Sequence, residues 1–165
     1  METGDNLFQI YLLQDGHSRE FGQVVRRIFP DMKDRIRKIH GISELSKSLP
    51  ILLLLPEGAI LPDNLTLPAG SVVVVSSEET RQLHILAKQP ISVISCGFHS
   101  KDTVTLSSRQ EDGAVVSLLR EITNPEGETV EPLDVPLHLH PGYPDYPLMA
   151  AAAASFCCQF ENHNT

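Results

Sequence analysis

The sequence has little cysteine, no tryptophan and no long apolar segment. Three cysteines among 165 residues, two of them adjacent, are too few for a disulfide framework, so we expect reduced thiols and a cytoplasmic location. The longest candidate membrane segment, 148–158, falls well short of the about 18 residues that span a bilayer. Residues 1–8 lack the basic region and apolar stretch of a signal peptide. From these absences we expect a protein that is neither inserted in a membrane nor secreted.

A surplus of basic residues is also missing. The chain has 13 Lys+Arg against 21 Asp+Glu, a net charge of −8 and a pI near 5.3, which argues against a nucleic-acid partner. The charge is uneven, because residues 1–50 carry eight Lys+Arg and seven Asp+Glu, whereas residues 51–165 carry five and fourteen. A hydrophobic content of 41% at this length is enough for one packed core. We therefore expect a single domain over residues 1–165.

The first part of the chain alternates between apolar runs and a helix signal. Residues 7–13, 51–55, 72–75 and 91–96 are short apolar runs that predict strands, the middle two covered on both faces. Ser76 and Glu79 have the spacing of a capping box, which predicts a helix to about residue 88. Strand, helix and strand at this spacing indicate a parallel sheet.

The pattern changes after Gly97. Residues 103–106, 114–122 and 130–139 predict strands separated by short turn signals, which requires antiparallel pairing. Residues 147–160 are apolar nearly all round, so they predict a buried helix. The expected fold is α/β, with a Rossmann-like, mainly parallel sheet, flanking helices and an antiparallel C-terminal meander.

Most of the basic residues lie between residues 19 and 38. Apolar residues recur there at steps of three and four, which predicts an amphipathic helix that Pro30 kinks or divides in two. The basic stripe, defined as Arg19, Arg26, Lys33 and Arg37, would lie on its opposite side. The simpler interpretation is a solvated helix face, and the alternative is a docking surface for an acidic protein partner.

Two groups of side chains have spacings that permit chemistry. Asp134, His138 and His140 share one side of a predicted strand and are candidate metal ligands, although they also fit the polar side of an edge strand. Cys96 ends a predicted parallel strand three residues before His99, the spacing of a candidate nucleophile and base. A buried thiol and a solvent-facing imidazole are the simpler interpretation, and we expect no metal and no cofactor.

Two loops are candidates for anion binding. Gly16, His17 and Ser18 precede a predicted helix, whose first amides can bind an anion. Gly97 and Lys101 follow a parallel strand, where α/β sheets bind their ligands. A nucleotide-sugar or another anion would fit between these loops.

Three stretches resemble the second half of the central domain of the Mur ligases, the ATP-dependent ligases of bacterial cell-wall precursor synthesis. Residues 72–79 resemble a valine run followed by an acidic helix start, and residues 91–98 with 102–104 resemble the next strand and its successor. Residues 139–151 resemble the motif that opens a buried helix. The likeness is strongest over residues 70–160 and implies a shared fold.

The sequence differs from that family in the residues that bind ATP. The family binds the phosphates on Gly-x-x-Gly-Lys-[Ser/Thr], whereas this sequence contains no Gly-Lys pair and has Asp15 at the corresponding turn. In the C-terminal motif, Tyr143, Pro144 and Pro147 replace polar residues of the family. The resemblance therefore implies that ATP-dependent ligation has been lost.

These observations favour a non-catalytic binding or interaction module derived from a Mur-ligase-like scaffold. Its contact surface would be the basic stripe, or the chain would self-associate through the strand at 130–139. One alternative is a protein that binds a nucleotide-sugar or another anion. The other is a small enzyme that uses Cys96 and His99, or the face of His138 and His140.

Overall fold

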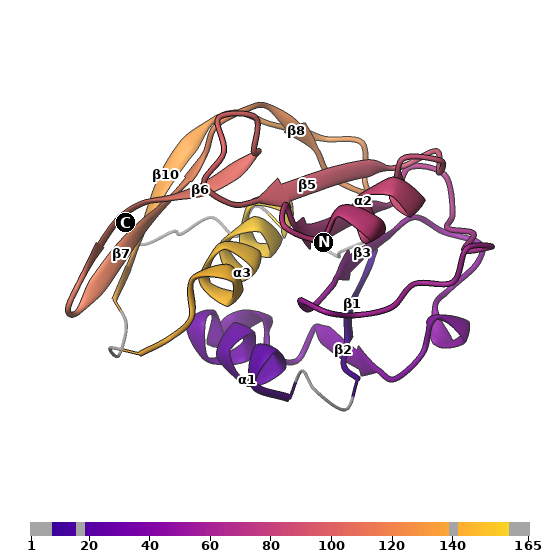
Figure 1. Ribbon diagram of the computed structural model, residues 1–165, viewed down its shortest axis with the longest axis horizontal. Coiled ribbons are helices and arrows are strands. Elements are labelled where there is room, and N and C mark those ends of the chain that lie inside the picture. The colour runs from indigo at the N-terminus through magenta and orange to yellow at the C-terminus, as the bar shows by residue number, and fades with distance from the viewer. Residues whose placement is uncertain (1–7, 16–18, 139–141, 159–165) are drawn as a thin grey trace, which may run out of the picture.

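The computed structural model of the chain describes residues 8–15, 19–138 and 142–158 (Figure 1). Its helices and strands follow one another in the order β1 (Gln9–Leu13), α1 (Arg19–Ile28), η1 (Pro30–Met32), β2 (Ile36–Ile39), η2 (Ile42–Glu44), β3 (Ile51–Leu54), β4 (Val72–Ser76), α2 (Thr80–Leu86), β5 (Ser92–Cys96), β6 (Val104–Gln110), β7 (Gly113–Leu118), β8 (Ile122–Thr123), β9 (Thr129–Val130), β10 (Leu133–His138) and α3 (Asp145–Cys158). The elements labelled η are 3-10 turns.

One eight-stranded sheet organises the fold, in the order β10-β7-β6-β5-β4-β3-β1-β2. The strands from β2 to β6 pair in parallel, whereas β6, β7 and β10 pair antiparallel. β8 and β9 form a separate antiparallel pair. The structure thus confirms an α/β fold with a mainly parallel sheet and an antiparallel C-terminal meander.

The sequence of each strand matches its place in the sheet. β3 and β4 are buried at every position and lie side by side in the parallel part of the sheet. In β1, Ile10 and Leu12 contact one apolar cluster, while Tyr11 and Leu13 contact the other. A parallel strand covered on both faces needs apolar side chains on both, which is why these runs are continuous.

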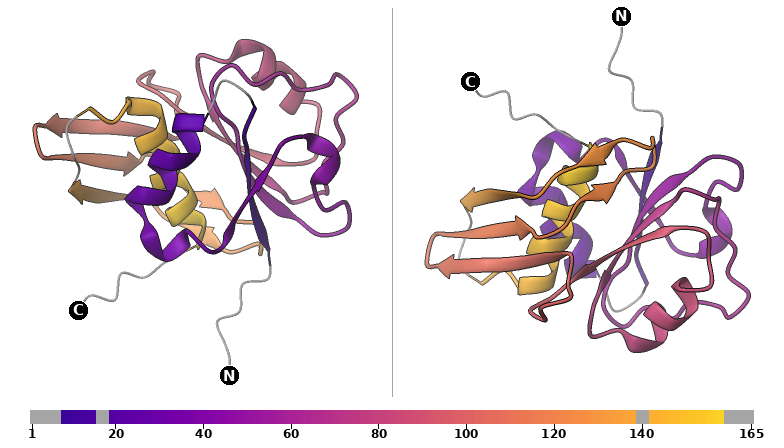
Figure 2. Two further views of the ribbon diagram at one scale, coloured as in Figure 1. Left: turned by 90° about the horizontal axis from the view of Figure 1, so that it is seen from below. Right: turned by 90° about the horizontal axis from the view of Figure 1, so that it is seen from above.

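The two faces of the sheet are covered differently. Helices α1 and α3 pack together and cover one face, as Figure 2 shows. Helix α2, Leu45 and the segment 59–67 cover the other face over β1 to β5. The outer face of β10 carries exposed side chains at Asp134, Pro136 and His138, as is common in antiparallel sheets.

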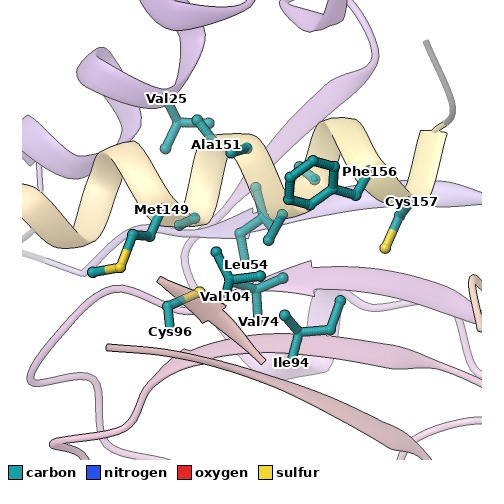
Figure 3. Packing of buried hydrophobic residues seen from close by; sticks show 14 of the residues in the cluster. Val25, Leu54, Val74, Ile94, Cys96, Val104, Met149, Ala151, Phe156 and Cys157 are labelled. Atoms are coloured by element: carbon teal, nitrogen blue, oxygen red, sulfur yellow. The ribbon is translucent and has the colours of Figure 1, made fainter. Parts of the chain in front are cut away.

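Helix α3 lies between the sheet and α1. Five alanines, at 150–154, are fully buried, and their small side chains let the helix pack closely against both neighbours (Figure 3). Tyr146 donates its hydroxyl hydrogen to the carbonyl of Leu55 and stacks on Phe21 of α1, with ring centroids 5.5 Å apart. The predicted buried helix is confirmed and begins at Asp145.

The helix predicted over residues 19–38 is wrong in its second half. α1 ends at Ile28, and Phe29, which precedes Pro30, leaves the helical region with φ −126° and ψ 82°. Residues 36–39 then form β2, in which Ile36 pairs with Ile10 of β1. Sheet pairing thus outweighs the helical spacing of the apolar residues.

Two further boundaries differ from the sequence-based expectation. Helix α2 starts at Thr80 rather than beside Ser76, and no side chain caps it, because Ser76 instead closes a turn with the amide of Glu78, 3.2 Å away. The predicted strand at 114–122 is divided between β7 and β8. Only the first part stays in the main sheet.

Candidate functional site

The carboxyl edge of the parallel strands is where open α/β sheets bind ligands, at the point where the strand order reverses. β1 lies between β2 and β3, so the reversal falls beside β1. Asp15 follows β1 and Glu57 follows β3 at this edge, with His99 after β5. The anion-binding candidates Gly16, His17 and Ser18 lie outside the described residues.

Carboxylates dominate this edge. Partial burial and the nearby charges of Glu79 and Glu78 raise the pKa of Glu57. The ring Nε2 of His99 lies 3.1 Å from a carboxylate oxygen of Glu78. A phosphate brought here would meet several negative charges, so the electrostatics of this edge disfavour an anionic ligand.

The loop between β5 and β6 is held by a buried carboxylate. Asp102 is 3% exposed and accepts hydrogen bonds from Ser77 Oγ, at 3.1 Å, and from the amide of His99, at 2.9 Å. A Cβ at Gly97 would lie 2.2 Å from Ser77 Oγ and 2.6 Å from an Asp102 oxygen. Gly97 thus makes room for this contact, while Lys101 is exposed on the loop.

The predicted pair of Cys96 and His99 does not form a reactive site in this arrangement. Cys96 lies at the end of β5 as expected, but its side chain sits in the core beneath α3 (Figure 3). Burial and the charge of Asp102 raise the pKa of its thiol well above the ordinary value. The ring of His99 is exposed and paired with Glu78. The thiol is therefore kept protonated and away from substrate.

The basic stripe does not exist as one helix face. Arg19 and Arg26 lie on α1, but Lys33 follows η1 and Arg37 belongs to β2. Arg26 is half-buried and donates through Nη2 to the carbonyl of Ile36, at 3.1 Å. It joins α1 to β2, because the chain between them folds back beside the helix.

The metal candidates lie on the outer edge strand of the sheet. Asp134 and His138 are both exposed on β10, four residues and therefore about 13 Å apart along the strand. His140 lies outside the described residues. Among residues 8–15, 19–138 and 142–158, no group of three His, Cys, Asp or Glu side chains could hold a metal ion.

A groove at the opposite edge of the sheet is a second candidate site. It has a volume of about 810 Å³ and runs between the turn η1, the segment from β9 to β10 and the end of α3. We call it the β10 groove. Its lining residues are Phe29, Pro30, Asp31, Met32, Thr129, Val130, Glu131, Pro132, Leu133, Asp134, Val135, Pro136, Ser155 and Phe156. β10 runs parallel to β6, so its start lies at the amino edge of the sheet, away from the carboxylates described above.

Asn124 fixes one wall of the β10 groove. Its side-chain nitrogen donates to the carbonyl of Cys157, at 2.9 Å, and to a carboxylate oxygen of Glu128, at 3.0 Å. Its side-chain oxygen accepts from the amides of Glu126 and Glu128. The β8–β9 pair is thereby anchored on the end of α3, which preforms the groove.

Sequence reasoning placed an edge strand here but missed the groove. Val130 and Val135 are half-buried beside the core cluster, and Leu133 next to them is 42% exposed, so the three together leave apolar surface uncovered. The sequence contained one signal, an apolar strand interrupted by two prolines and two carboxylates. It did not show that the turn η1 would form the opposite wall.

Comparison with protein-family models and with curated protein sequences finds no match to this chain. Within the described parts of the chain, no helix is both long enough and apolar enough to cross a bilayer.

Proposed function

We propose that this chain is a non-catalytic protein-interaction module, built on a scaffold that resembles the central domain of the Mur ligases, and that the β10 groove is its docking surface. One observation carries the proposal, namely a groove lined largely by apolar residues beside the outermost strand of the sheet. Partner segments bind in such grooves because burying apolar side chains there releases water from both surfaces.

The carboxyl edge of the sheet is poorly suited to binding an anion or to Cys–His catalysis, and this supports the proposal over those two alternatives. Glu57, Glu78 and Glu79 follow β3 and β4 at the carboxyl edge, and their charge opposes a nucleotide or nucleotide-sugar there. The buried, protonated thiol of Cys96 counts against a Cys–His enzyme. Neither alternative has a comparable positive feature in the described residues.

The ancestry rests on the sequence resemblance and is compatible with the order of the elements. The valine-rich β4, the short α2, the strand β5 and the alanine-rich α3 occur in the order that the resemblance implies. The absence of a Gly-Lys pair from the sequence favours a scaffold without ATP-dependent ligation.

A pair of photo-crosslinking variants tests the docking surface. A photoreactive phenylalanine analogue replaces Leu133 in one variant and Leu119 in the other, which are 42% and 44% exposed. Only Leu133 lines the β10 groove. In the source cell we expect a defined protein adduct at position 133 that is absent at position 119. Equal adducts at both positions, or none at 133, would contradict the proposal.

A thermal-shift measurement separates the module from a small-molecule binder. Ligand at a hundredfold excess over its dissociation constant stabilises the folded state by about 2.7 kcal/mol, which is easily detected. We expect no shift with ATP and magnesium, or with a panel of UDP-sugars. A clear shift with any of them would favour the anion-binding alternative.

A further inference from the structure

The geometry points to the class of ligand that the β10 groove takes, an extended peptide segment that combines large apolar side chains with lysine or arginine. This inference rests on the proposed function and specifies the partner of the same site. Three properties of the groove support it, namely its exposed apolar residues, the free edge of β10 and the charged residues in its lining.

The apolar residues of the groove that a partner could contact lie on its strand side. Val130 and Val135 are half-buried and Leu133 is exposed there, whereas Phe156 and Met32 belong to the lining but are almost fully covered. Leu133 lies opposite Leu118 in the antiparallel pair, so it points to the same side of the sheet as the core. An apolar side chain from a partner would cover the exposed part of Leu133, as the core already covers Leu118.

The free edge of β10 favours an extended partner. The amide of Leu119 donates to the carbonyl of Thr103 at 2.8 Å, so the backbone N–H and C=O of Leu119 point towards β6. Backbone groups alternate in direction along a strand, so those of Leu118 point towards β10 and pair with Leu133. By this alternation, the backbone groups on the free side of β10 belong to Asp134, Pro136 and His138. No described strand pairs with that side. A peptide alongside it would gain main-chain hydrogen bonds.

The prolines limit what can pair there. Pro136 has no N–H to offer at the middle of the free edge, so a long continuous strand would leave a carbonyl without a donor. Edge prolines of this kind discourage sheet-to-sheet association between whole domains. A short peptide, held by side chains as well as by two or three backbone bonds, is less affected than a second copy of this chain.

The charge around the groove selects basic residues. Asp31, Glu131 and Asp134 line it and are exposed, and among the described residues its lining includes no lysine, arginine or histidine. Asp31 and Glu131 come from opposite walls, the turn η1 and the segment between β9 and β10, whereas Asp134 alternates with Leu133 and lies on the outer face of β10. A cationic side chain between the walls would therefore be attracted from both sides, whereas an acidic peptide would be repelled.

Peptide selection tests this inference on the full chain. A phage library of random dodecapeptides is selected on the immobilised protein, and the dissociation constants of the enriched peptides are measured by fluorescence anisotropy. We expect the enriched sequences to contain more Lys and Arg than Asp and Glu around one or more large apolar residues. We also expect their affinity to fall as the salt concentration rises.

Variants assign that binding to the groove. Leu133→Asp and the milder Leu133→Ala should each weaken it, the first by tenfold or more, whereas Leu119→Asp should change it less than twofold. The double variant Asp31→Lys/Glu131→Lys should weaken it at least tenfold. The same charge change at Glu111→Lys/Asp112→Lys, in the turn between β6 and β7, should have little effect. Circular dichroism melting checks that each variant folds.

The outcomes separate the two proposals. If peptides depend on Leu133 but are acidic, or ignore the charge reversal at Asp31 and Glu131, the groove remains the docking surface and the inference about basic partners is overturned. If no peptide is enriched, or binding ignores Leu133, both proposals fail. Self-assembly that rises with concentration and is abolished by Leu133→Asp would make a second copy the occupant and overturn the inference.

Discussion

The side-chain amide of Asn124 donates a hydrogen bond to the main-chain carbonyl of Cys157, 33 residues further along the chain, at 2.9 Å. Asn124 is 2% exposed, so this bond is shielded from water. It satisfies a carbonyl in the last turn of α3, where the helix itself supplies no partner. The same side chain organises the turn that leads to β9, so one residue holds both the helix end and the wall of the β10 groove.

Replacing Asn124 with alanine should therefore destabilise the protein and loosen the groove. Asn124→Ala removes four hydrogen bonds and leaves a buried carbonyl without its donor, which we expect to lower the free energy of unfolding by about 2–4 kcal/mol. Urea denaturation measures the loss. The neighbouring Thr123 is exposed, so Thr123→Ala should stay within about 0.5 kcal/mol of the wild type. Equal stability of the two variants would show that Asn124 does not anchor the wall.

A second prediction concerns the close contact at Gly97. Gly97→Ala places a methyl group against Ser77 Oγ and Asp102, so the hydrogen bond between those side chains must move or break. We expect a loss of about 1–3 kcal/mol in the free energy of unfolding, measured by chemical denaturation. Gly41 is the matched control, because its backbone is extended and its nearest neighbour would be 3.9 Å from the new methyl group. A Gly97→Ala protein as stable as Gly41→Ala would contradict this account.

The carboxylates at the carboxyl edge predict a pH dependence. The pKa of Glu57 is raised in the folded state, so the folded protein binds this proton more tightly than the unfolded chain. Stability from this group is then present at low pH and falls as the pH rises through the raised pKa. Glu57→Gln removes a partly buried charge and its repulsion from Glu79 and Glu78, so the variant should melt at a higher temperature than the wild type at pH 7.

The difference between the two proteins should shrink as the pH falls and disappear below 4.5, the ordinary pKa of the group, because Glu57 is then protonated in both states. Differential scanning calorimetry across this range measures it. Glu111→Gln, in the exposed turn between β6 and β7, controls for the loss of one negative charge. A Glu57→Gln protein that melts lower at pH 7 would show that this carboxylate has a stabilising partner.

The three thiols should differ in reactivity. Burial raises the pKa of Cys158 to about 11 even though Arg35 lowers it, and Cys158 is half-buried at the end of α3. Cys96 and Cys157 are fully buried, with the pKa of each thiol raised further. With iodoacetamide at pH 8, we expect slow labelling of Cys158 and none of the other two until denaturant is added. Mass spectrometry maps the sites, and rapid labelling of Cys96 in the native protein would revive the nucleophile hypothesis.

Local sequence predicted the elements that are apolar on every side. β3 and β4 could be recognised because each is a continuous run of large aliphatic residues, and such a run is stable only when both faces are covered. Residues 36–39 were misassigned because Ile36 and Ile39 are three apart, which suits a helix as well as it suits the ends of a short strand. Their pairing with β1, more than 20 residues away in the chain, decided between the two.

For the candidate sites too, the sequence predicted where a residue lies along its strand or helix but not what its side chain contacts. Cys96 was correctly placed at the end of a parallel strand, but its burial depends on α3, which begins 49 residues later. The basic stripe failed for a related reason, since Arg26 turns inward to a carbonyl of β2 that helical periodicity cannot anticipate. Side-chain direction follows from which elements meet, and spacing along one element does not report that.

The sequence by itself determined that this chain builds a parallel sheet with a buried alanine-rich helix, since burial of those apolar residues is the main favourable term in folding. Only the tertiary structure decided which strands became neighbours, where carboxylates from separate loops converged, and that the turn after α1 would face β10 across a groove. Those relationships join residues far apart in the chain, and their geometry is set by packing between whole elements rather than by the preference of any one segment.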